Sequence, residues 1–258
     1  MNLNTPYIIS IAGFDPSGGA GLLADMKTIE NIGGYGLGIC SAITFQNESE
    51  FAGLKWITPK DILSQLTLLQ KKYPVEYVKI GLIQDENVLY MLIRHLKKTN
   101  NDVNIIWDPV IKASAGYIFH EQWNKDTLLQ ILKEITLITP NTDEIDFILE
   151  LLGISTIQLN NFIKKHNTCD FLVKAMIVED DQIQDVFFDQ QNKITFKGKI
   201  YPGYEKHGSG CVFSSSVTTF LAKGHSIPQA CKMAKKYVEY FLLSSKTKLG
   251  LHHLLNNN

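Results

Sequence analysis

Short apolar runs alternate with helical apolar stripes along most of this chain. The run from Tyr7 to Gly13 is rich in β-branched residues and ends at glycine, as a buried strand of a parallel sheet does. The turn-rich segment 14–21 follows, and the next apolar residues recur at helical spacing: Leu22, Leu23, Met26, Ile29 and Ile32. This stretch predicts a strand, a glycine-rich loop and a helix, with the loop where open α/β sheets bind their ligands.

The alternation continues to the end of the chain. Further strands are predicted at 39–45, 77–82, 104–108, 137–140 and 171–174, and further helices at 58–73, 85–98 and 124–134, then from 141, from about 211 and over 230–241. Residues 33–38 are predicted as a glycine-rich turn, and 185–201 alternate as antiparallel edge strands do. The pattern indicates a single α/β domain over residues 1–258 with a mostly parallel central sheet.

The charge balance favours a small-molecule partner. The 258 residues include 25 Lys and Arg against 26 Asp and Glu, which gives no long basic surface for nucleic acid. The four cysteines show neither a Cys-x-x-Cys pair nor metal-like spacing with histidine, so we expect reduced thiols. The first apolar run is too short for a signal sequence or a membrane span. We therefore expect a cytoplasmic protein without a nucleic-acid or membrane partner.

A second glycine-rich loop, at 206–211, opens a helix with a buried face. Around Gly208, Ser209 and Gly210 the backbone N–H groups have no intrahelical partners and lie at the positive end of the helix dipole, which suits a phosphate. Cys211 falls in the first turn, where the same features favour a thiolate, so it is a candidate for proton transfer or nucleophilic attack. The competing interpretation is a tight turn, with Cys211 as a small apolar residue beneath it.

Polar side chains also gather where the predicted strands end. The Gln46 amide ends one strand, where it suits a flat polar ligand, and Lys174 ends another. Asp108 and Glu144 follow consecutive strands and together suit Mg²⁺ beside a nucleotide phosphate, although both would also serve as helix caps. Asp25, on the first helix, is close enough to the loop to reach a ligand, but its position alone favours a solvated carboxylate.

A series of short motifs runs through nearly the whole chain: residues 12–21, Ala24-Asp25 with Lys27-Thr28, Tyr35-Gly36, Thr44 to Asn47, Val78-Lys79 with Gly81, Asp108 to Val110, Thr139 to Asn141 with Glu144, and His207 to Cys211. In this order the motifs resemble the hydroxymethylpyrimidine and phosphomethylpyrimidine kinases of thiamine biosynthesis, in the ribokinase-like superfamily. The resemblance implies a three-layer α/β/α sandwich that phosphorylates 4-amino-5-hydroxymethyl-2-methylpyrimidine and its monophosphate. ATP and Mg²⁺ would be the cofactors, and the protein would be a homodimer.

The resemblance also implies residue roles. The pyrimidine would contact five positions: Gly13, Asp25, Gln46, Leu82 and Val110. The nucleotide would be organised by Asp108, Asn141, Glu144 and Lys174, with Asp108 and Glu144 holding Mg²⁺. Cys211 would accept the hydroxyl proton of the substrate, while the N–H groups of 208–211 stabilise the transferred phosphoryl group.

The chain departs from this family where Lys174 is followed by Ala-Met-Ile rather than Gly-Gly-His. Glycine permits backbone shapes that Ala175 and Met176 resist, so we expect altered nucleotide contacts or an altered second phosphorylation. Two alternatives remain open: a pyridoxal or pyridoxine kinase, because vitamin B6 is also a flat heteroaromatic alcohol, and a ligand-binding homologue without catalysis. The Gln46 amide favours the aminopyrimidine, and the intact Cys211 favours an enzyme.

Overall fold

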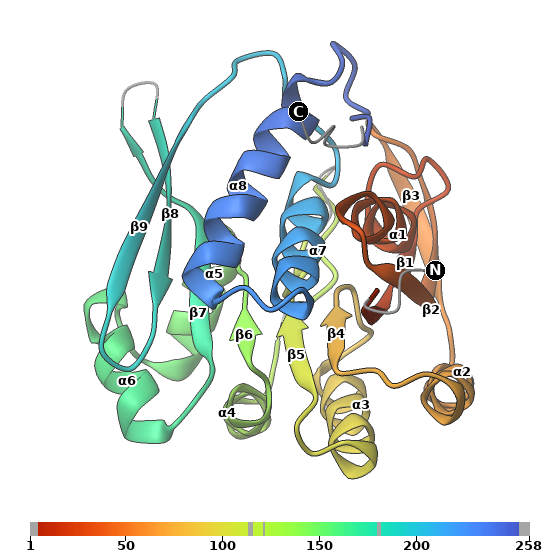
Figure 1. The fold of residues 1–258 in the computed structure, drawn as a ribbon. Helices are drawn as coiled ribbons and strands as arrows, with labels where there is room; N and C mark the ends of the chain where they lie inside the picture. The colour runs from red at the N-terminus through yellow and green to blue at the C-terminus, as the bar shows by residue number, and fades with distance from the viewer. Residues whose placement is uncertain (1–4, 113–115, 121, 180–181, 253–258) are drawn as a thin grey trace.

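The computed structural model describes residues 5–112, 116–120, 122–179 and 182–252. Nine strands form one sheet in the order β3-β2-β1-β4-β5-β6-β7-β8-β9 (Figure 1). Their bounds are β1 Tyr7–Phe14, β2 Tyr35–Gln46, β3 Phe51–Trp56, β4 Tyr77–Ile80, β5 Asn104–Trp107, β6 Leu137–Ile138, β7 Asp170–Glu179, β8 Gln182–Phe188 and β9 Lys193–Lys199. The six neighbouring strands β2, β1, β4, β5, β6 and β7 pair in parallel. Strand β3 at one edge, and β8 and β9 at the other, pair antiparallel with their neighbours. The mostly parallel sheet is confirmed.

Helices cover both faces of this sheet and complete the three-layer sandwich (Figure 1). The helices are α1 Gly21–Ile32, α2 Pro59–Lys72, α3 Glu86–Thr99, α4 Lys125–Glu134, α5 Thr142–Leu152, α6 Leu159–His166, α7 Ser209–Ala222 and α8 Ile227–Leu243, with a 3₁₀ turn at Thr156–Gln158. One apolar core lies between the sheet and the helices α2, α3, α4, α5 and α6. A second core lies on the other face of the sheet, under α1, α7 and α8. Because α7 is buried on all sides from Val212 to Leu221, its N-terminus is held firmly against the strand ends.

The predicted turn at 33–38 is wrong from residue 35 onwards, because β2 begins at Tyr35. The glycines there belong to the strand and let α1 pack close to it. A Cβ atom on Gly36 would lie 2.7 Å from the sulfur of Met26, and one on Gly38 would lie 3.3 Å from Leu22. The glycines thus serve close packing between a helix and a strand, which local composition does not distinguish from a turn.

Two elements and one strand boundary differ from the sequence prediction. Strand β3 and helix α6 were not predicted, since β3 is a short edge strand and α6 has only eight residues. Strand β7 does not end at Lys174 but runs on to Glu179, because a register shift between Val173 and Ile177 lets it continue along β8. The antiparallel strands predicted in 185–201 are confirmed as β8 and β9. Among the described residues, no helix is long and apolar enough to cross a membrane.

Replacing Asp170 with asparagine should stabilise the protein at neutral pH. Burial, and then the nearby Asp189, raise the pKa of Asp170 from 3.8 to about 6. Below pH 3.8 the carboxyl group is protonated in both folded and unfolded chains, so the fold loses stability as the pH rises through 6 and the acid ionises. Urea unfolding of Asp170→Asn should show a gain of about 1 kcal/mol at pH 7.5 that disappears at acidic pH. A gain of the same size at both pH values would contradict this cause.

Candidate active site

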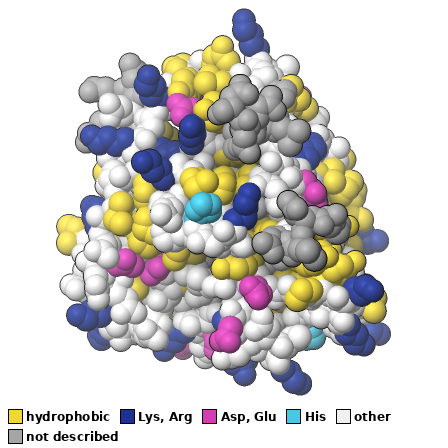
Figure 2. Space-filling model, viewed as in Figure 1, with side chains coloured by type: hydrophobic (Ala, Val, Ile, Leu, Met, Phe, Trp, Pro, Cys, Tyr) yellow, Lys and Arg dark blue, Asp and Glu magenta, His cyan; other side chains and the backbone are white. Residues whose placement is uncertain are grey.

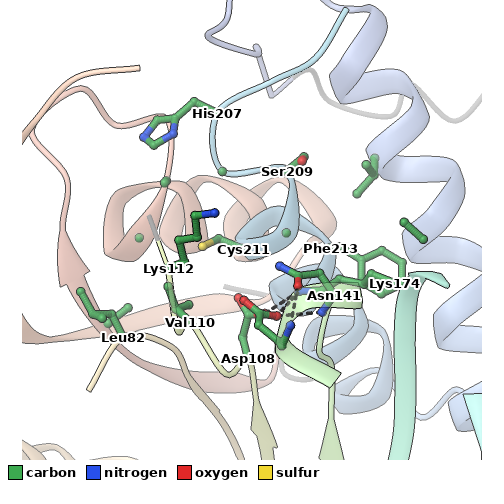
Figure 3. Close-up of a pocket in the computed structure, with 18 of the residues that line it drawn as sticks. Leu82, Asp108, Val110, Lys112, Asn141, Lys174, His207, Ser209, Cys211 and Phe213 are labelled. Carbon is green, nitrogen blue, oxygen red and sulfur yellow. Dashed lines mark hydrogen bonds and ion pairs between the residues drawn. The ribbon is translucent and has the colours of Figure 1, made fainter. Parts of the chain in front are cut away.

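A cavity of about 420 Å³ lies over the carboxyl ends of the parallel strands (Figure 3). We call the part lined by residues of β1, β2 and the loops after β4 and β5 the acceptor end; it includes Gly13, Gln46, Leu82 and Val110. The donor end, lined from α5 and from β7 to β9, includes Lys174. The N-terminus of α7 lies between the two ends (Figure 3). Of the residues given a role by the sequence, all but Asp25 line this cavity.

The N-terminus of α7 has no side-chain cap. The N–H of Ser209 makes a long hydrogen bond to the carbonyl of Lys206, at 3.4 Å, and the N–H groups of Gly210 and Cys211 lie in the first turn, where a helix offers donors to a ligand. Gly208 occupies the cap position with φ 76, in the left-handed region that favours glycine. The same glycine touches the loop after β1, because a Cβ on it would lie 2.1 Å from the carbonyl oxygen of Gly19. The loop before α7 is also joined to that loop by a buried pair, His207 Nε2 and Asp15 Oδ2, 2.9 Å apart. The two glycine-rich loops are therefore held together as one unit.

Replacing Gly208 with alanine should disable this unit. The new methyl group would meet the backbone of Gly19 and Ala20, which cannot move aside cheaply. We expect unfolding stability to fall by at least about 2 kcal/mol and turnover to be largely lost, as measured by urea unfolding and a kinase assay.

Gly224 provides the matched control for this substitution. Its φ is 88, but a Cβ there would meet nothing within 4 Å. Gly224→Ala should therefore lower the free energy of unfolding by only about 1 kcal/mol, which is the cost of the left-handed backbone conformation for alanine, and should leave turnover intact. Equal effects of the two substitutions would show that the contact with Gly19 is unimportant.

Asp25 is fully buried beneath the cavity, so the interpretation as a solvated carboxylate is wrong. Lys79 Nζ donates to its two carboxylate oxygens at 2.9 and 3.1 Å, and the hydroxyl groups of Ser10 and Ser215 each donate at 2.6 Å. Asp25 does not line the cavity, whereas Lys79 does. The structure thus places Asp25 behind Lys79, and its predicted contact with a ligand remains a prediction.

Lys79 was not predicted as a site residue, although it stands out in the sequence. It is the charged residue within the apolar strand β4, between Val78 and Ile80, and its side chain is fully buried. Its Nζ also lies 3.8 Å from Asp108 Oδ2. Burial alone would lower the pKa of Lys79, but Asp25 and Asp108 more than offset this and raise it above its usual value. The side chain is therefore a permanent ammonium ion in the cavity floor.

The donor end contains a second lysine–carboxylate cluster. Lys174 Nζ lies 2.7 Å from Asp108 Oδ1 and 4.0 Å from Glu144 Oε2 (Figure 3). Glu144 accepts the N–H of Asn141 at 2.7 Å, and Asn141 Oδ1 accepts the N–H of Glu144 at 2.9 Å, which is a capping box at the start of α5. The helix-cap interpretation is thus confirmed for Glu144, which also lines the cavity. Asp108 instead pairs with lysines and is not a helix cap.

The carboxylates Asp108 and Glu144 fit Mg²⁺ as a partner shared with a nucleotide. Among the described residues, no group of three or more His, Cys, Asp or Glu is placed to hold a metal ion by itself. Mg²⁺ commonly takes one or two carboxylates and completes its shell with water and phosphate oxygens. Burial raises the pKa of Glu144 to about 7; Lys174 opposes this, and Asp108 adds to it. A cation between the two acids would therefore favour the ionised form of Glu144.

Cys211 lies in the first turn of α7 and faces the cavity, as predicted, but its thiol is not ionised. Burial raises the pKa of Cys211 to about 12, and the positive charge of Lys79 only partly offsets this. The expected thiolate is wrong because removal from water outweighs the helix dipole. The thiol thus carries its proton at neutral pH.

The chain keeps a glycine-like backbone where it departs from the family motif. Ala175 has φ 52, a left-handed conformation that costs a non-glycine residue about 1 kcal/mol or more. The N–H of Ala175 donates to Asp185 Oδ1 at 2.8 Å, and the other oxygen of Asp185 pairs with Lys235 on α8. Alanine thus adopts the shape that it resists because the buried Asp185 holds it in place, and the expected change in nucleotide contacts remains a prediction.

Lysine side chains gather around the donor end. Lys199 and Lys235 both line the cavity, and Figure 2 shows Lys and Arg side chains over β9 and α8 on this face. With the N-terminus of α7, these lysines offer cationic partners for phosphate groups, although Asp108, Glu144 and Asp185 also line this end. The acceptor end differs, because its walls are neutral side chains such as the Gln46 amide together with Lys79 and Lys112.

The chain is similar over most of its length to known kinases and proteins of thiamine biosynthesis. A family model described as phosphomethylpyrimidine kinase matches residues 15–256. A hydroxymethylpyrimidine/phosphomethylpyrimidine kinase from Aquifex aeolicus is 28% identical over 246 residues, covering 94% of this chain and 96% of that protein. A bifunctional thiamine biosynthesis protein from Methanocaldococcus jannaschii is 29% identical over 94% of this chain, but the chain spans only 55% of its length.

Solved structures confirm the ribokinase-like fold. A phosphomethylpyrimidine kinase from Clostridium difficile superposes with a TM-score of 0.74 at 26% identity, covering 91% of this chain and 98% of that one. A pyridoxal kinase from Staphylococcus aureus in complex with ADP gives a TM-score of 0.82 at 21% identity, covering 98% of this chain and 95% of that one. The second likeness concerns the fold alone.

Proposed function

Because this chain belongs to the phosphomethylpyrimidine kinase family, we propose that it transfers the γ-phosphoryl group of ATP to 4-amino-5-hydroxymethyl-2-methylpyrimidine and then to the resulting monophosphate. One observation carries the proposal: a single cavity joins an acceptor end that includes the Gln46 amide, a helix N-terminus without a side-chain cap and a lysine–carboxylate donor end. Phosphoryl transfer depends mainly on positioning and electrostatic stabilisation, and this arrangement supplies both.

At the acceptor end, the pyrimidine ring would lie between the side chains of Leu82 and Val110. The Gln46 amide has both a donor and an acceptor, which match an amino group and a ring nitrogen. Gly13 leaves room for the flat ring beside Leu82. Any larger residue would fill that space, because its Cβ atom would lie only 3.1 Å from the Leu82 side chain. Asp25 would act indirectly, by fixing the ammonium group of Lys79 in the cavity floor.

At the donor end, Lys174 and Asn141 would contact the phosphates of ATP, and Asp108 and Glu144 would hold Mg²⁺. Bound there, Mg²⁺ neutralises phosphate charge during transfer. The N–H groups of Gly208, Ser209, Gly210 and Cys211 would surround the transferred phosphoryl group, since α7 points its N-terminus between the two ends.

Cys211 would hold the substrate hydroxyl in line for transfer. With its pKa near 12 the thiol does not serve as a ready base. In a loose transition state the attacking oxygen forms little bond before the phosphoryl group departs from ADP, so its proton leaves late and a strong base is not required. We therefore retain Cys211 as the catalytic residue, with orientation of the hydroxyl as its main task.

We also propose a cytoplasmic homodimer that joins through the β3 edge of the sheet. Large apolar side chains remain exposed near this edge, among them Phe45 at 54%, Ile118 at 54% and Tyr117 at 48%. An exposed edge strand with such neighbours is suited to pairing with a second copy. Sedimentation velocity should give a dimer mass, and Phe45→Glu should shift it towards the monomer.

The second candidate is a pyridoxal kinase, because pyridoxal is also a flat heteroaromatic alcohol that the cavity with its Gln46 amide would admit. A coupled spectrophotometric assay that follows ADP, run with each alcohol in turn, separates the two functions. A higher kcat/KM with the aminopyrimidine supports our proposal, and a higher value with pyridoxal supports the second candidate. ADP formation with either alcohol would exclude a binding protein without catalysis.

A further inference from the structure

The acceptor end carries a positive charge that its described neighbours do not balance. The lining side chains there are neutral, such as Thr44, Gln46 and Phe119, except for two lysines. Lys79 is neutralised by Asp25, 2.9 Å away. Lys112 is different: in the part of the chain that the structure describes, no carboxylate lies within ion-pair distance of its amine. A neutral pyrimidine alcohol offers this amine no counter-charge.

Lys112 is held at the cavity edge by its own loop. It forms an isolated antiparallel bridge with Ile118, and the N–H of Phe119 donates to the carbonyl of Ile111 at 2.8 Å. The ring of Phe51, on β3, lies across Phe119 with 5.4 Å between ring centres. Lys112 and Cys211 both line the cavity (Figure 3). The amine therefore belongs to the same cavity in which phosphoryl transfer would occur.

We propose that Lys112 binds the phosphate of a monophosphorylated acceptor and thereby permits the second transfer; this rests on the proposed function. In the first transfer an alcohol oxygen bonds to the γ-phosphorus, the bond from that phosphorus to the bridging oxygen of ADP breaks, and the hydroxyl proton passes to a non-bridging oxygen of the transferred phosphoryl group. In the second, a phosphate oxygen of the acceptor forms the new bond, the same bond to ADP breaks, and no proton has to be removed.

The two transfers therefore make different demands on the cavity. The second brings an anion against the γ-phosphate, so it needs an additional cation on the acceptor side. Lys174 and Lys235 already pair with carboxylates at the donor end, and Lys79 pairs with Asp25. Lys112 is the unpaired cation that the described acceptor end supplies.

The test is Lys112→Met, with the alcohol and its monophosphate as separate acceptors. We expect kcat/KM for the monophosphate to fall about tenfold or more, the value for the alcohol to change less than about twofold, and the KM for ATP to stay constant. Lys112→Arg should restore most of the loss. Lys199→Met is the matched control: Lys199 is also exposed and without an ion-pair partner among the described residues, but it lies at the donor end, so its loss should affect both acceptors alike.

Other results separate the failure of this inference from that of the proposed function. An equal loss with both acceptors, or a raised KM for ATP in Lys112→Met, overturns the role of Lys112 and leaves the kinase assignment intact. A wild-type protein that makes only the monophosphate overturns it too, since there is then no second transfer to serve. Failure of the wild type with both pyrimidines overturns the proposed function itself.

Discussion

Cys211→Ala should lower kcat for the pyrimidine alcohol by about a hundredfold or more, while the dissociation constant of ATP stays within about twofold. The thiol faces the cavity from the first turn of α7, where the hydroxyl must lie to meet the γ-phosphate. Removing it leaves the N–H groups of the helix in place, so nucleotide binding is retained while the hydroxyl loses its orientation. Steady-state kinetics together with calorimetric titration of a non-hydrolysable ATP analogue measure both effects.

Cys211→Ser is the matched control for this prediction. Its hydroxyl group is close in size to the thiol and still accepts and donates hydrogen bonds. If orientation is the main task, serine should retain much more turnover than alanine. If the task were that of a thiolate base, serine would be as poor as alanine, and unchanged turnover in alanine would remove Cys211 from the mechanism.

The second large effect is on stability: Lys79→Met should lower the free energy of unfolding by about 3–5 kcal/mol. The substitution leaves the carboxylate of Asp25 fully buried without its counter-ion, and among the described residues its remaining hydrogen bonds come from the hydroxyl groups of Ser10 and Ser215. Loss of one partner of a buried ion pair is far more costly than loss of both. Urea unfolding at pH 7.5 measures the change.

The double variant Asp25→Asn/Lys79→Met tests the cause. Asparagine is neutral, its Oδ1 can accept from one of the two serine hydroxyl groups, and its NH2 group can donate to the oxygen of the other, so the double variant should recover a large part of the lost stability. Its turnover should remain low, since Lys79 also lies 3.8 Å from Asp108 in the cavity. Equal stability of the single and double variants would show that the loss does not arise from an unpaired charge.

The alternation of strand and helix periods along the sequence predicted a mostly parallel sheet, and the family resemblance implied its three layers. The sequence did not predict the start of β2, because Gly36 and Gly38 are there to admit α1, and close packing leaves the same local signature as a turn. The continuation of β7 past Lys174 was also missed, since it depends on β8 and on the hydrogen bond from Ala175 to Asp185. Both features are set by residues distant in sequence.

For the candidate site, the sequence predicted which residues line the cavity better than it predicted their burial and charge. Strand ends and motif order identified the cavity residues, but not their electrostatic state. Periodicity placed Asp25 on an ambiguous face of α1, and only the structure shows it enclosed by side chains from β1, β4 and α7. The helix dipole suggested an ionised Cys211, whereas burial keeps it neutral. Such properties depend on three-dimensional enclosure, which one sequence does not encode in any local pattern.

The most direct test of the central claim is the mass of the product formed from ATP, Mg²⁺ and 4-amino-5-hydroxymethyl-2-methylpyrimidine, with pyridoxal in a parallel reaction. We predict that the pyrimidine gains first one and then a second phosphoryl group, and that its monophosphate declines as the diphosphate accumulates. An unmodified pyrimidine beside a phosphorylated pyridoxal would contradict the account.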